Sequence, residues 1–287
     1  MVMKKYLAFD IGGTKIKWGI LNEEGAILEK ASFDTRRESE ESFLENIIKI
    51  ALERKNEVEG VAISMPGFID SVNGIPKVCY AIRCIEGKCI TKIIEEKTGL
   101  KASVENDGKC VALAEKFNGN ATECSDFVCV TIGTGIGGGI YVNNKLLRGS
   151  TFQGGEFGFM RCNEKGMYSN TASTLALIKE YMKYKNLDKA VDGQVVFEEG
   201  EKDPKVKEII NEWYGLIAIG IYNLSATLNP EKILIGGGVS EREEFIEEVV
   251  NALENIEAWK DVKCVIERCK HKNDEGMIGA VYNFLNE

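Results

Sequence analysis

Two short stretches of the sequence match each other without a gap, and this internal repeat restricts the fold more than any other feature. Residues 9–14 (Phe-Asp-Ile-Gly-Gly-Thr) align with residues 130–135 (Val-Thr-Ile-Gly-Thr-Gly), 121 positions further along the 287-residue chain. Each stretch follows an apolar run and precedes a second strand-like run, so each is predicted to be a β-hairpin with a turn of small residues. A repeat at this scale indicates two related lobes that face each other across a cleft.

Apolar residues recur with strand-like and helix-like periods in alternation, which predicts an α/β fold. The predicted strands are residues 6–9, 17–21, 27–33, 61–64, 102–105, 127–132, 139–142, 232–235 and 262–267. The predicted helices are residues 41–54, 91–98, 108–117, 171–184, 206–228, 243–256 and 276–285. A polar stretch near residues 118–125 predicts an N-terminal lobe of residues 1–118, with a C-terminal helix at about 273–287 packing back on it, and a C-terminal lobe of residues 119–272.

The charge balance disfavours two classes of partner. Thirty-six basic and 45 acidic residues give a net charge of −9, whereas nucleic acids and anionic membranes require a basic face. No apolar run approaches the roughly 20 residues of a membrane span, and no signal-peptide pattern begins the chain. The nine cysteines are scattered singly, as is typical of reduced thiols. We therefore expect a cytoplasmic protein that binds neither nucleic acid nor membrane, although a local pocket for an anionic substrate stays open.

The turn of the first hairpin is suited to binding phosphate. Gly12 and Gly13 allow backbone N–H groups to approach an anion closely, and Thr14 and Lys15 add a hydroxyl and a positive charge. Asp10, at the end of the preceding strand, is expected to hold Mg²⁺ directly or through water, because hard cations prefer carboxylate oxygen. A plain hairpin turn would explain the two glycines but not the flanking aspartate, threonine and lysine.

The turn of the second hairpin predicts a second phosphate loop by the same logic. Its candidate ligands are Thr131, Gly133, Thr134 and Gly135, in a run with five glycines among nine residues. So many glycines raise the entropy lost on folding, and a bound ligand would offset that loss. Two such turns on opposing lobes would grip a polyphosphate from both sides, which implies a nucleoside triphosphate and closure of the lobes.

A run of three glycines follows the predicted strand at residues 232–235. At Gly236, Gly237 and Gly238 the flat backbone can pack against an adenine ring or a ribose. The alternative is a helix-entry loop that Ser240 caps.

Two carboxylates lie in segments that suit a polyol substrate. Asp107 ends a strand and opens a helix, where it can accept a proton from a substrate hydroxyl while Asn106 hydrogen-bonds a neighbouring one. A helix cap is the alternative role for this pair. Glu156 lies in a loop bracketed by glycines and suits a pair of vicinal hydroxyls, and Gly67 lies in a turn that is expected to form a wall of the cleft.

These segments, taken in order, resemble the ROK (repressor, open reading frame, kinase) sugar kinases, which have the actin-like, or ribonuclease-H-like, ATPase fold. The resemblance covers nearly the whole chain and rests on Asp10–Lys15, Pro66–Gly67, Glu105–Asp107, Gly133–Gly139, Gly155–Gly158 and Gly236–Gly238. It implies two actin-like lobes with a nucleotide and sugar cleft between them, ATP and Mg²⁺ as cofactors, and a homodimer. It also implies that Asp107 is the catalytic base, that Asn106 and Glu156 bind sugar hydroxyls, and that Mg²⁺ lies near Asp10.

The sequence departs from the family where the anomeric end of the sugar would lie. Family members have a histidine at the position of Phe159, then a zinc-binding cysteine cluster and a sugar-binding glutamate. Here only Cys162 of the cluster remains, so no zinc site is expected, and the glutamate position falls on Ser169 or Asn170. These changes remove partners of a free C1 hydroxyl and add an apolar wall. They favour a substituted C1, as in a β-glucoside, and Thr171–Thr174 is similar to the zinc-less β-glucoside kinases of the family.

The predicted reaction is phosphoryl transfer from MgATP to a sugar hydroxyl, expected to be the 6-OH, with Asp107 as the base. An N-acetylmannosamine or glucose kinase is an alternative. A regulator of this family would carry an N-terminal helix-turn-helix, for which Asp10 leaves no room, and a non-catalytic sugar-binding module would need neither Asp107 nor two phosphate loops. Acetate-type kinases share the fold but need an arginine-rich site, and sequence alone does not place Arg83, Arg148 and Arg161.

Overall fold

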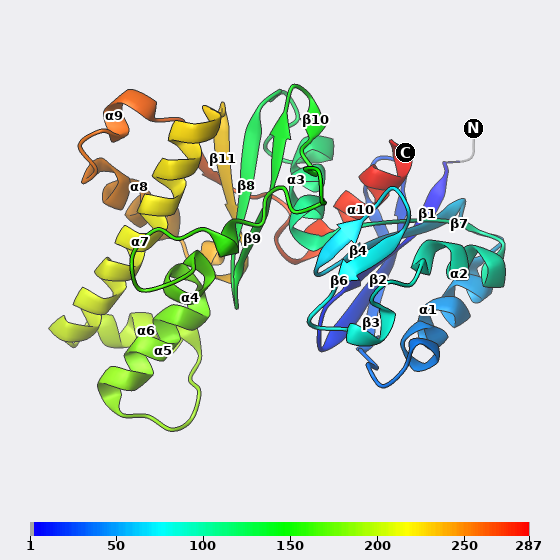
Figure 1. Cartoon of the computed structure of the whole chain (residues 1–287), viewed down its shortest axis with the longest axis horizontal. Helices are drawn as coiled ribbons and strands as arrows, with labels where there is room; N and C mark the ends of the chain where they lie inside the picture. The colour runs from blue at the N-terminus through cyan, green and yellow to red at the C-terminus, as the bar shows by residue number, and fades with distance from the viewer. Residues whose placement is uncertain (1–2, 287) are drawn as a thin grey trace. The chain divides into compact units, whose positions relative to one another are not determined.

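The computed structural model describes residues 3–286, which form two compact units (Figure 1). The first unit contains the residues up to Glu123, the segment Lys145–Gly155 and the residues from Asn273 onward. The second contains Cys124–Asn144 and Glu156–Lys272. This division differs from the predicted one at residues 119–123 and at Lys145–Gly155, both of which the sequence placed in the C-terminal lobe. Partly buried hydrogen bonds of Arg148 and Phe152, described below, connect the second of these segments to the rest of the first unit.

The first unit is built on a five-stranded sheet of order β3-β2-β1-β4-β7. β1 and β2 form an antiparallel hairpin, and β4 and β7 run parallel to β1. The strands are β1 (Lys5–Ile11), β2 (Lys15–Asn22), β3 (Ile27–Asp34), β4 (Gly60–Met65) and β7 (Lys101–Asn106), with a separate pair β5 (Phe68–Asp70) and β6 (Ile75–Val78). The helices are α1 (Glu40–Arg54), α2 (Ile90–Thr98), α3 (Asp107–Asn118) and α10 (Glu275–Leu285).

Both faces of this sheet are covered by helices, as the alternation along β1 shows. Leu7 and Phe9 pack in a cluster with residues of α1 and α2, whereas Tyr6 and Ala8 pack in another with α3 and α10. Because successive side chains of a strand point to opposite faces, β1 is hydrophobic on both sides. Asp10 is the exception near the end of the strand and is only partly buried.

The second unit repeats the topology of the first. Its strands have the order β9-β8-β11-β12, in which β8 and β9 are an antiparallel hairpin and β11 and β12 run parallel to β8. They are β8 (Phe127–Ile132), β9 (Ile136–Val142), β11 (Lys232–Gly236) and β12 (Val265–Arg268), and the two-residue strand β10 (Lys145–Leu146) belongs to the segment Lys145–Gly155. The two hairpins predicted from the internal repeat are confirmed, and Asp10 and Thr131 occupy equivalent places in equivalent strands.

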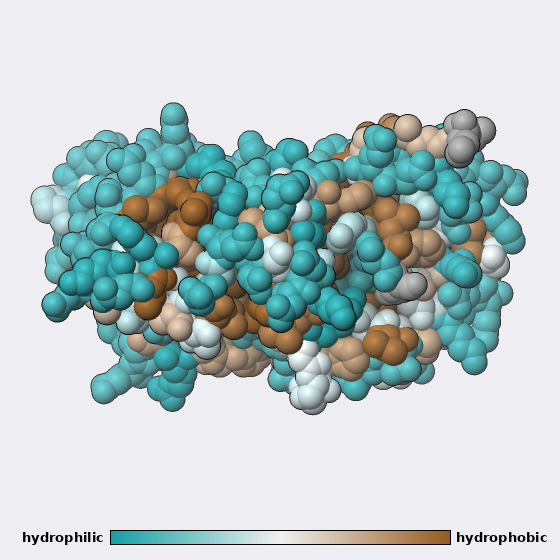
Figure 2. Space-filling view, turned by 90° about the horizontal axis from the view of Figure 1, so that it is seen from above, coloured by the Kyte–Doolittle hydropathy of each residue, from teal (hydrophilic) through white to brown (hydrophobic). Residues whose placement is uncertain are grey.

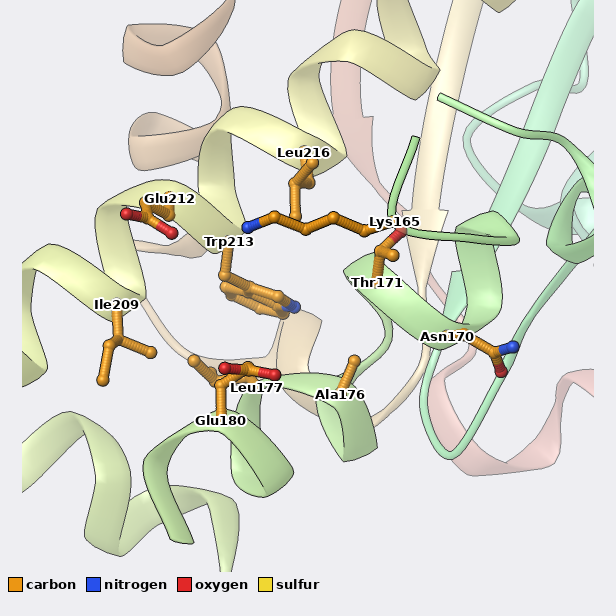
Figure 3. Close-up of a pocket in the computed structure, with 10 residues that line it drawn as sticks. All are labelled: Lys165, Asn170, Thr171, Ala176, Leu177, Glu180, Ile209, Glu212, Trp213 and Leu216. Carbon is orange, nitrogen blue, oxygen red and sulfur yellow. The ribbon is translucent and has the colours of Figure 1, made fainter. Parts of the chain in front are cut away.

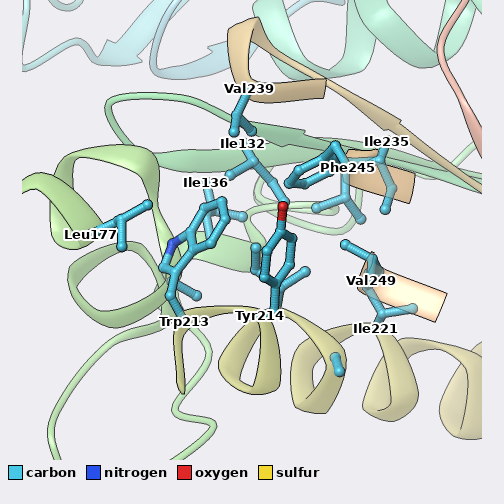
Figure 4. Close-up of a cluster of buried hydrophobic side chains, with 14 of the residues drawn as sticks. Ile132, Ile136, Leu177, Trp213, Tyr214, Ile221, Ile235, Val239, Phe245 and Val249 are labelled. Atoms are coloured by element: carbon cyan, nitrogen blue, oxygen red, sulfur yellow. The ribbon is translucent and has the colours of Figure 1, made fainter. Parts of the chain in front are cut away.

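One long helix, α7 (Pro204–Leu228), packs against the sheet of the second unit. Trp213 and Tyr214 of α7 contact each other and Phe245 of α8, with ring centroids 5.0 to 6.0 Å apart, and Figure 4 shows these rings gathered with Ile132 and Ile235. The other helices are α4 (Tyr168–Ala172), α5 (Thr174–Lys185), α6 (Gly193–Gly200), α8 (Phe245–Glu254) and α9 (Trp259–Val262).

Several predicted elements have other bounds in the structure; the strand predicted at 139–142, for example, is β9 and begins at Ile136. The helix predicted at 171–184 is two helices, because Ser173 is extended (φ −71°, ψ 162°) and its side chain accepts a hydrogen bond from the backbone of Ala176, which starts α5. The helix predicted at 243–256 is shorter, since α8 spans Phe245–Glu254. The strand predicted at 262–267 begins later, because α9 ends at Val262.

Hydrophilic residues cover most of the face seen in Figure 2, and hydrophobic residues show there in smaller patches. Among residues 3–286, no helix combines the length and the apolarity needed to traverse a bilayer. The long helix α7, for instance, contains several charged residues near its beginning.

Candidate active site

Three parallel strands of the first unit end at one edge of its sheet, and predicted site residues lie there. In the strand register, Asp10 lies beside Ser64, and Ser64 lies beside Glu105. The carboxyl ends of neighbouring parallel strands open into loops at the same edge, which is where ligands bind in open α/β sheets. The predicted residues Asp10, Gly67 and Asp107 are therefore brought together.

The side chain of Asn106 joins a turn, a carboxylate and a helix at this edge. Its oxygen accepts a hydrogen bond from the backbone of Lys109 at 3.0 Å and so caps α3. Its Nδ2 donates to the backbone oxygen of Gly67 and to Oδ1 of Asp107, each at 3.0 Å. The helix cap considered from the sequence is thus present, and both amide hydrogens of Asn106 are already engaged.

The carboxylate of Asp107 is accessible to a substrate, and its pKa is raised. Its side chain is exposed, its Oδ1 accepts from the backbone of Gly108 at 2.8 Å, and its Oδ2 receives no hydrogen bond from residues 3–286. Loss of solvation among the surrounding protein atoms raises the pKa of Asp107, the negative charge of Asp10 adds to this, and Gly108 and the Lys109 cation oppose it. These properties are typical of a general base.

Asp10 lies partly buried among three close neighbours. Its Oδ1 accepts from Oγ of Ser64 at 2.9 Å, and its Oδ2 lies 3.5 Å from Nζ of Lys17. Gly276, the second residue of α10, packs so closely that a Cβ there would collide with the Asp10 carboxylate. The side chain keeps 21% of its surface exposed, so this single carboxylate, with lone pairs to spare, fits a hydrated Mg²⁺ better than a cage of protein ligands.

The first glycine turn presents its polar groups to solvent. The N–H of Gly12 donates to the backbone oxygen of Lys15 at 2.9 Å, and the hydroxyl of Thr35 donates to that of Gly12 at 2.8 Å. These bonds fix the turn, whereas the side chains of Thr14 and Lys15 are exposed. The side chains of Thr14 and Lys15, which are predicted phosphate ligands, are therefore accessible to a ligand.

The second glycine turn and the triple glycine contribute to one pocket within the second unit. Gly236 pairs with Thr131 across β11 and β8, so the loops after these strands are neighbours. The pocket has a volume of about 600 Å³, in the range of small-molecule sites. Its lining consists of Gly133, Thr134, Thr174, Leu175, Ile178, Asp192, Gly193, Gln194, Phe197, Glu198, Gly238, Val239, Glu241 and Arg242.

One wall of this pocket was not predicted from the sequence. The guanidinium carbon of Arg242 lies 3.9 Å from the ring centroid of Phe197, which belongs to α6. The hydroxyl of Thr174 and Nε of Arg242 are buried without a hydrogen-bond partner among the described residues. Buried polar atoms in proteins are nearly always paired, so a polar ligand in the pocket would supply the missing partners.

The glycines of these two loops differ in whether packing requires the absence of a side chain. Gly237 has φ +90°, and a Cβ there would collide with the backbone of Ile132, so packing between β11 and β8 requires a glycine. A Cβ at Gly133 or Gly238 would meet nothing within 4 Å, which leaves their backbones open to a ligand. Gly135 lies near Ser169, whose hydroxyl would be 3.5 Å from such a Cβ.

The segment that departs from the family also lies in the second unit. Glu156 is half-buried directly before a 3₁₀ helix, η2 (Phe157–Phe159), and Phe159 is 53% exposed. The hydroxyl of Ser169 accepts a hydrogen bond from the backbone of Ile136 in β9 at 2.8 Å. Asn170 lines a different pocket, with a volume of about 170 Å³. In that pocket the side chain of Lys165 extends toward Trp213 (Figure 3).

The chain is similar to known proteins over nearly its whole length. The sequence profile of the ROK family matches residues 6–287. A β-glucoside kinase of Listeria innocua is 36% identical over 99% of this chain and 98% of its own. A Listeria monocytogenes protein provisionally described as an N-acetylmannosamine kinase has a TM-score of 0.91 at 35% identity, covering 98% of this chain and 99% of that one. A ROK glucokinase of Streptomyces griseus, solved with glucose and AMPPNP, has a TM-score of 0.78 at 25% identity, covering 96% and 98%.

The duplicated sheet and these neighbours define a carbohydrate kinase with the actin-like ATPase fold, and the ATP analogue in the Streptomyces structure implies that ATP is the donor. The chain belongs to the ROK family. The predicted fold class, family and enzyme class are thereby confirmed. No role was predicted from the sequence for Ser64, Thr174, Phe197 or Arg242. Thr174 lies in a segment noted only for its likeness to the β-glucoside kinases, and Phe197 and Arg242 lie outside every motif that the sequence indicated.

Proposed function

We propose that this chain transfers the γ-phosphoryl group of MgATP to the 6-hydroxyl of a hexose whose C1 is substituted, with β-glucosides as the substrate class. The observation that carries the proposal is Asp107: an accessible carboxylate with a raised proton affinity, at the strand edge that also holds Asp10 and the first glycine turn. The chain is further proposed to act in the cytoplasm as a homodimer, on the family resemblance.

In the proposed reaction, Asp107 accepts the proton of the attacking hydroxyl late in a loose transition state, so catalysis consists mainly of positioning and charge stabilisation. Asp10 would hold a hydrated Mg²⁺, and that ion would supply positive charge next to the phosphates. Glu156 binds vicinal sugar hydroxyls and Gly67 forms a wall of the sugar site. Lys15 and Thr14 bind the phosphates from the first unit. The reaction requires closure of the lobes, which would exclude water as a competing acceptor.

The pocket of the second unit is proposed to hold the nucleotide. Gly238 and the stacked pair of Arg242 and Phe197 would enclose the base and ribose, and the unpaired hydroxyl of Thr174 would donate to them or to phosphate. The open backbone at Gly133, together with the nearby residues of the second turn, would bind the phosphates. Those nearby residues are Thr131, Thr134, Gly135, Gly236 and Gly237.

The substrate class rests on the segment around Phe159. An exposed phenylalanine offers a surface for an apolar substituent on C1, and the Ser169 hydroxyl, which β9 already uses, is a poor partner for a free C1 hydroxyl. The likeness to a β-glucoside kinase supports the same class. The second candidate is an N-acetylmannosamine kinase, which the likeness to the Listeria monocytogenes structure favours. A coupled ADP-release assay across a panel of free sugars, N-acetylated sugars and β-glucosides separates the two.

Asp107→Asn is expected to lower kcat by at least about 100-fold while the KM for the sugar changes little, since the base is lost and the binding groups remain. The pKa of Asp107 is raised in the folded state, so ionisation of this carboxyl lowers the free energy of unfolding. This loss of stability grows as the pH rises from the ordinary aspartate pKa to the raised one. The variant should therefore have an equal or higher Tm at neutral pH. Turnover near that of the wild type would remove Asp107 from the base role.

The pH dependence of kcat should follow the protonation of Asp107. Its pKa is raised, so activity should fall on the acid side at a pH above the ordinary aspartate value of about 3.9. The Lys109 cation favours the ionised form, and Lys109→Met should therefore move this acid limb to higher pH. Lys30→Met, which removes an exposed cation paired with Asp274, should leave the limb in place. An unchanged limb in Lys109→Met would contradict the assignment.

Alanine at two adjacent glycines should separate folding from nucleotide binding. Gly237→Ala should lower Tm, because of its positive φ and the collision with Ile132. Gly238→Ala should keep Tm and raise the KM for ATP several-fold, because the methyl group enters an open pocket. Gly215→Ala on α7, also without a neighbour within 4 Å, is the control and should change neither KM nor lower Tm. Equal KM values for ATP in all three variants would place the nucleotide elsewhere.

Phe159→Ala tests the substrate class. Loss of an aromatic contact worth about 1 kcal/mol should lower kcat/KM for an aryl β-glucoside by about 3- to 10-fold and leave that for free glucose nearly unchanged. Tyr184→Ala, at another aromatic side chain, 45% exposed, is the control and should affect neither substrate. A parallel loss for both substrates in Phe159→Ala would argue against a C1 substituent at this residue.

A further inference from the structure

A fully buried carboxylate lies immediately before the Asn106–Asp107 pair and is absent from the roles proposed above. The side chain of Glu105 has no exposed surface, and its two oxygens have different partners. Oε2 accepts from Nε of Arg148 at 2.6 Å, and Oε1 accepts from the backbone N–H of Asn106 at 2.8 Å. The carboxylate thus connects an arginine 43 positions away to the backbone N–H of Asn106, the residue before Asp107.

Arg148 reaches this site from the segment Lys145–Gly155 and makes a second bond there. One NH2 group donates to Oδ1 of Asn283, a buried residue of α10, at 2.8 Å. The planar fork of an arginine can donate in two directions at once from a fixed geometry, which a lysine cannot reproduce. Arg148 therefore joins the end of β7, its own segment and α10 within the first unit.

The bonds form a continuous series that ends on the proposed base. Arg148 holds Glu105, Glu105 holds the backbone of Asn106, and the side chain of Asn106 donates to Oδ1 of Asp107. We propose that Arg148 is a positioning residue for phosphoryl transfer, which acts through Glu105 and Asn106 to set the orientation of the Asp107 carboxylate. This inference rests on the proposed function, because it takes Asp107 as the base.

The alternative is that Arg148 and Glu105 only anchor the segment Lys145–Gly155, and this role explains fewer of the observed contacts. The segment Lys145–Gly155 has a second polar contact within the first unit, because Nζ of Lys109, a residue with 1% exposure, donates to the backbone oxygen of Phe152 at 3.1 Å. Anchoring of the segment is therefore shared with Lys109. Arg148, in addition, binds a carboxylate that accepts a hydrogen bond from the backbone N–H of Asn106. The ion pair is buried only on the Glu105 side, since 33% of the Arg148 side chain is exposed, and such a pair is weak evidence for a contribution to stability, which favours a role in geometry.

The test compares Arg148→Met with Arg148→Lys and with Asn283→Ala, which removes the other partner of Arg148 but leaves Glu105 bound. A misplacement of about 1 Å can cost about 100-fold in rate, so Arg148→Met should lower kcat by about 10- to 100-fold, with KM for sugar and ATP within about 3-fold. Arg148→Lys should recover a large part of kcat, because its ammonium group can still bind Glu105. Asn283→Ala should lower Tm and leave kcat within about 3-fold.

A double-mutant cycle then tests the route through Glu105. Glu105→Gln keeps the shape of the side chain but weakens one of its two contacts, and it should lower kcat without a matching change in KM. If both residues act in one series, the double variant Arg148→Met/Glu105→Gln should lose no more kcat than the worse single variant. Multiplicative losses would overturn the proposal. If Arg148→Met does not fold, Arg148→Lys, Glu105→Gln and Asn283→Ala still decide it by the same comparison of kcat with KM.

The same assay distinguishes failure of this inference from failure of the proposed function. A wild-type protein that phosphorylates no sugar, or an Asp107→Asn variant with normal turnover, would refute the function or the base. An active wild type, an inactive Asp107→Asn variant and an Arg148→Met variant with kcat within about 3-fold of the wild type would refute only the positioning role. An Asn283→Ala variant that loses as much kcat as Arg148→Met would also refute that role and leave the function intact.

Discussion

The parallel pairing of β1, β4 and β7 is the constraint on which the site in the first unit depends. Helices bury both faces of this sheet. Polar side chains therefore escape the cost of burial only where the strands end. The register sets Asp10 beside Ser64 and Ser64 beside Glu105. Three loops therefore open at one edge, and the carboxylates of Asp10 and Asp107 lie close enough for one to raise the pKa of the other.

The two units share one topology but differ in the residue that ends the first strand of each hairpin. The strand position that holds Asp10 in β1 holds Thr131 in β8, so a negative charge in one unit corresponds to a neutral hydroxyl in the other. A hydroxyl and open glycine backbone can approach phosphate without repulsion, whereas a carboxylate near phosphate requires a cation between them. In the proposed function, this difference is the reason why the base and the Mg²⁺ site are proposed in the first unit and the nucleotide pocket in the second.

Local signals predicted much of the fold, and pairing between distant segments was beyond them. The hairpin turns at Gly12 and Gly133 were predictable because glycines and flanking strands are adjacent in the sequence. The break at Ser173 was missed because the apolar period runs through it. The wall formed by Phe197 and Arg242 and the contact of Arg148 with Glu105 join residues about 40 positions apart. Such residues become neighbours only when the chain folds, so local patterns in one sequence do not predict their contacts.

The hydrogen bonds of Asn106 bear on how a sugar would be recognised. Its two amide hydrogens are donated to Gly67 and Asp107, and its oxygen caps α3. An amide so occupied is better suited to orienting the base than to reading sugar hydroxyls, for which it would have to release a bond. Recognition of the hydroxyls would then fall mainly on Glu156, and discrimination at C1 on the surface around Phe159. Chemistry and specificity would thus reside in different segments, so the choice of sugar could change during evolution without disturbing the series from Arg148 to Asp107.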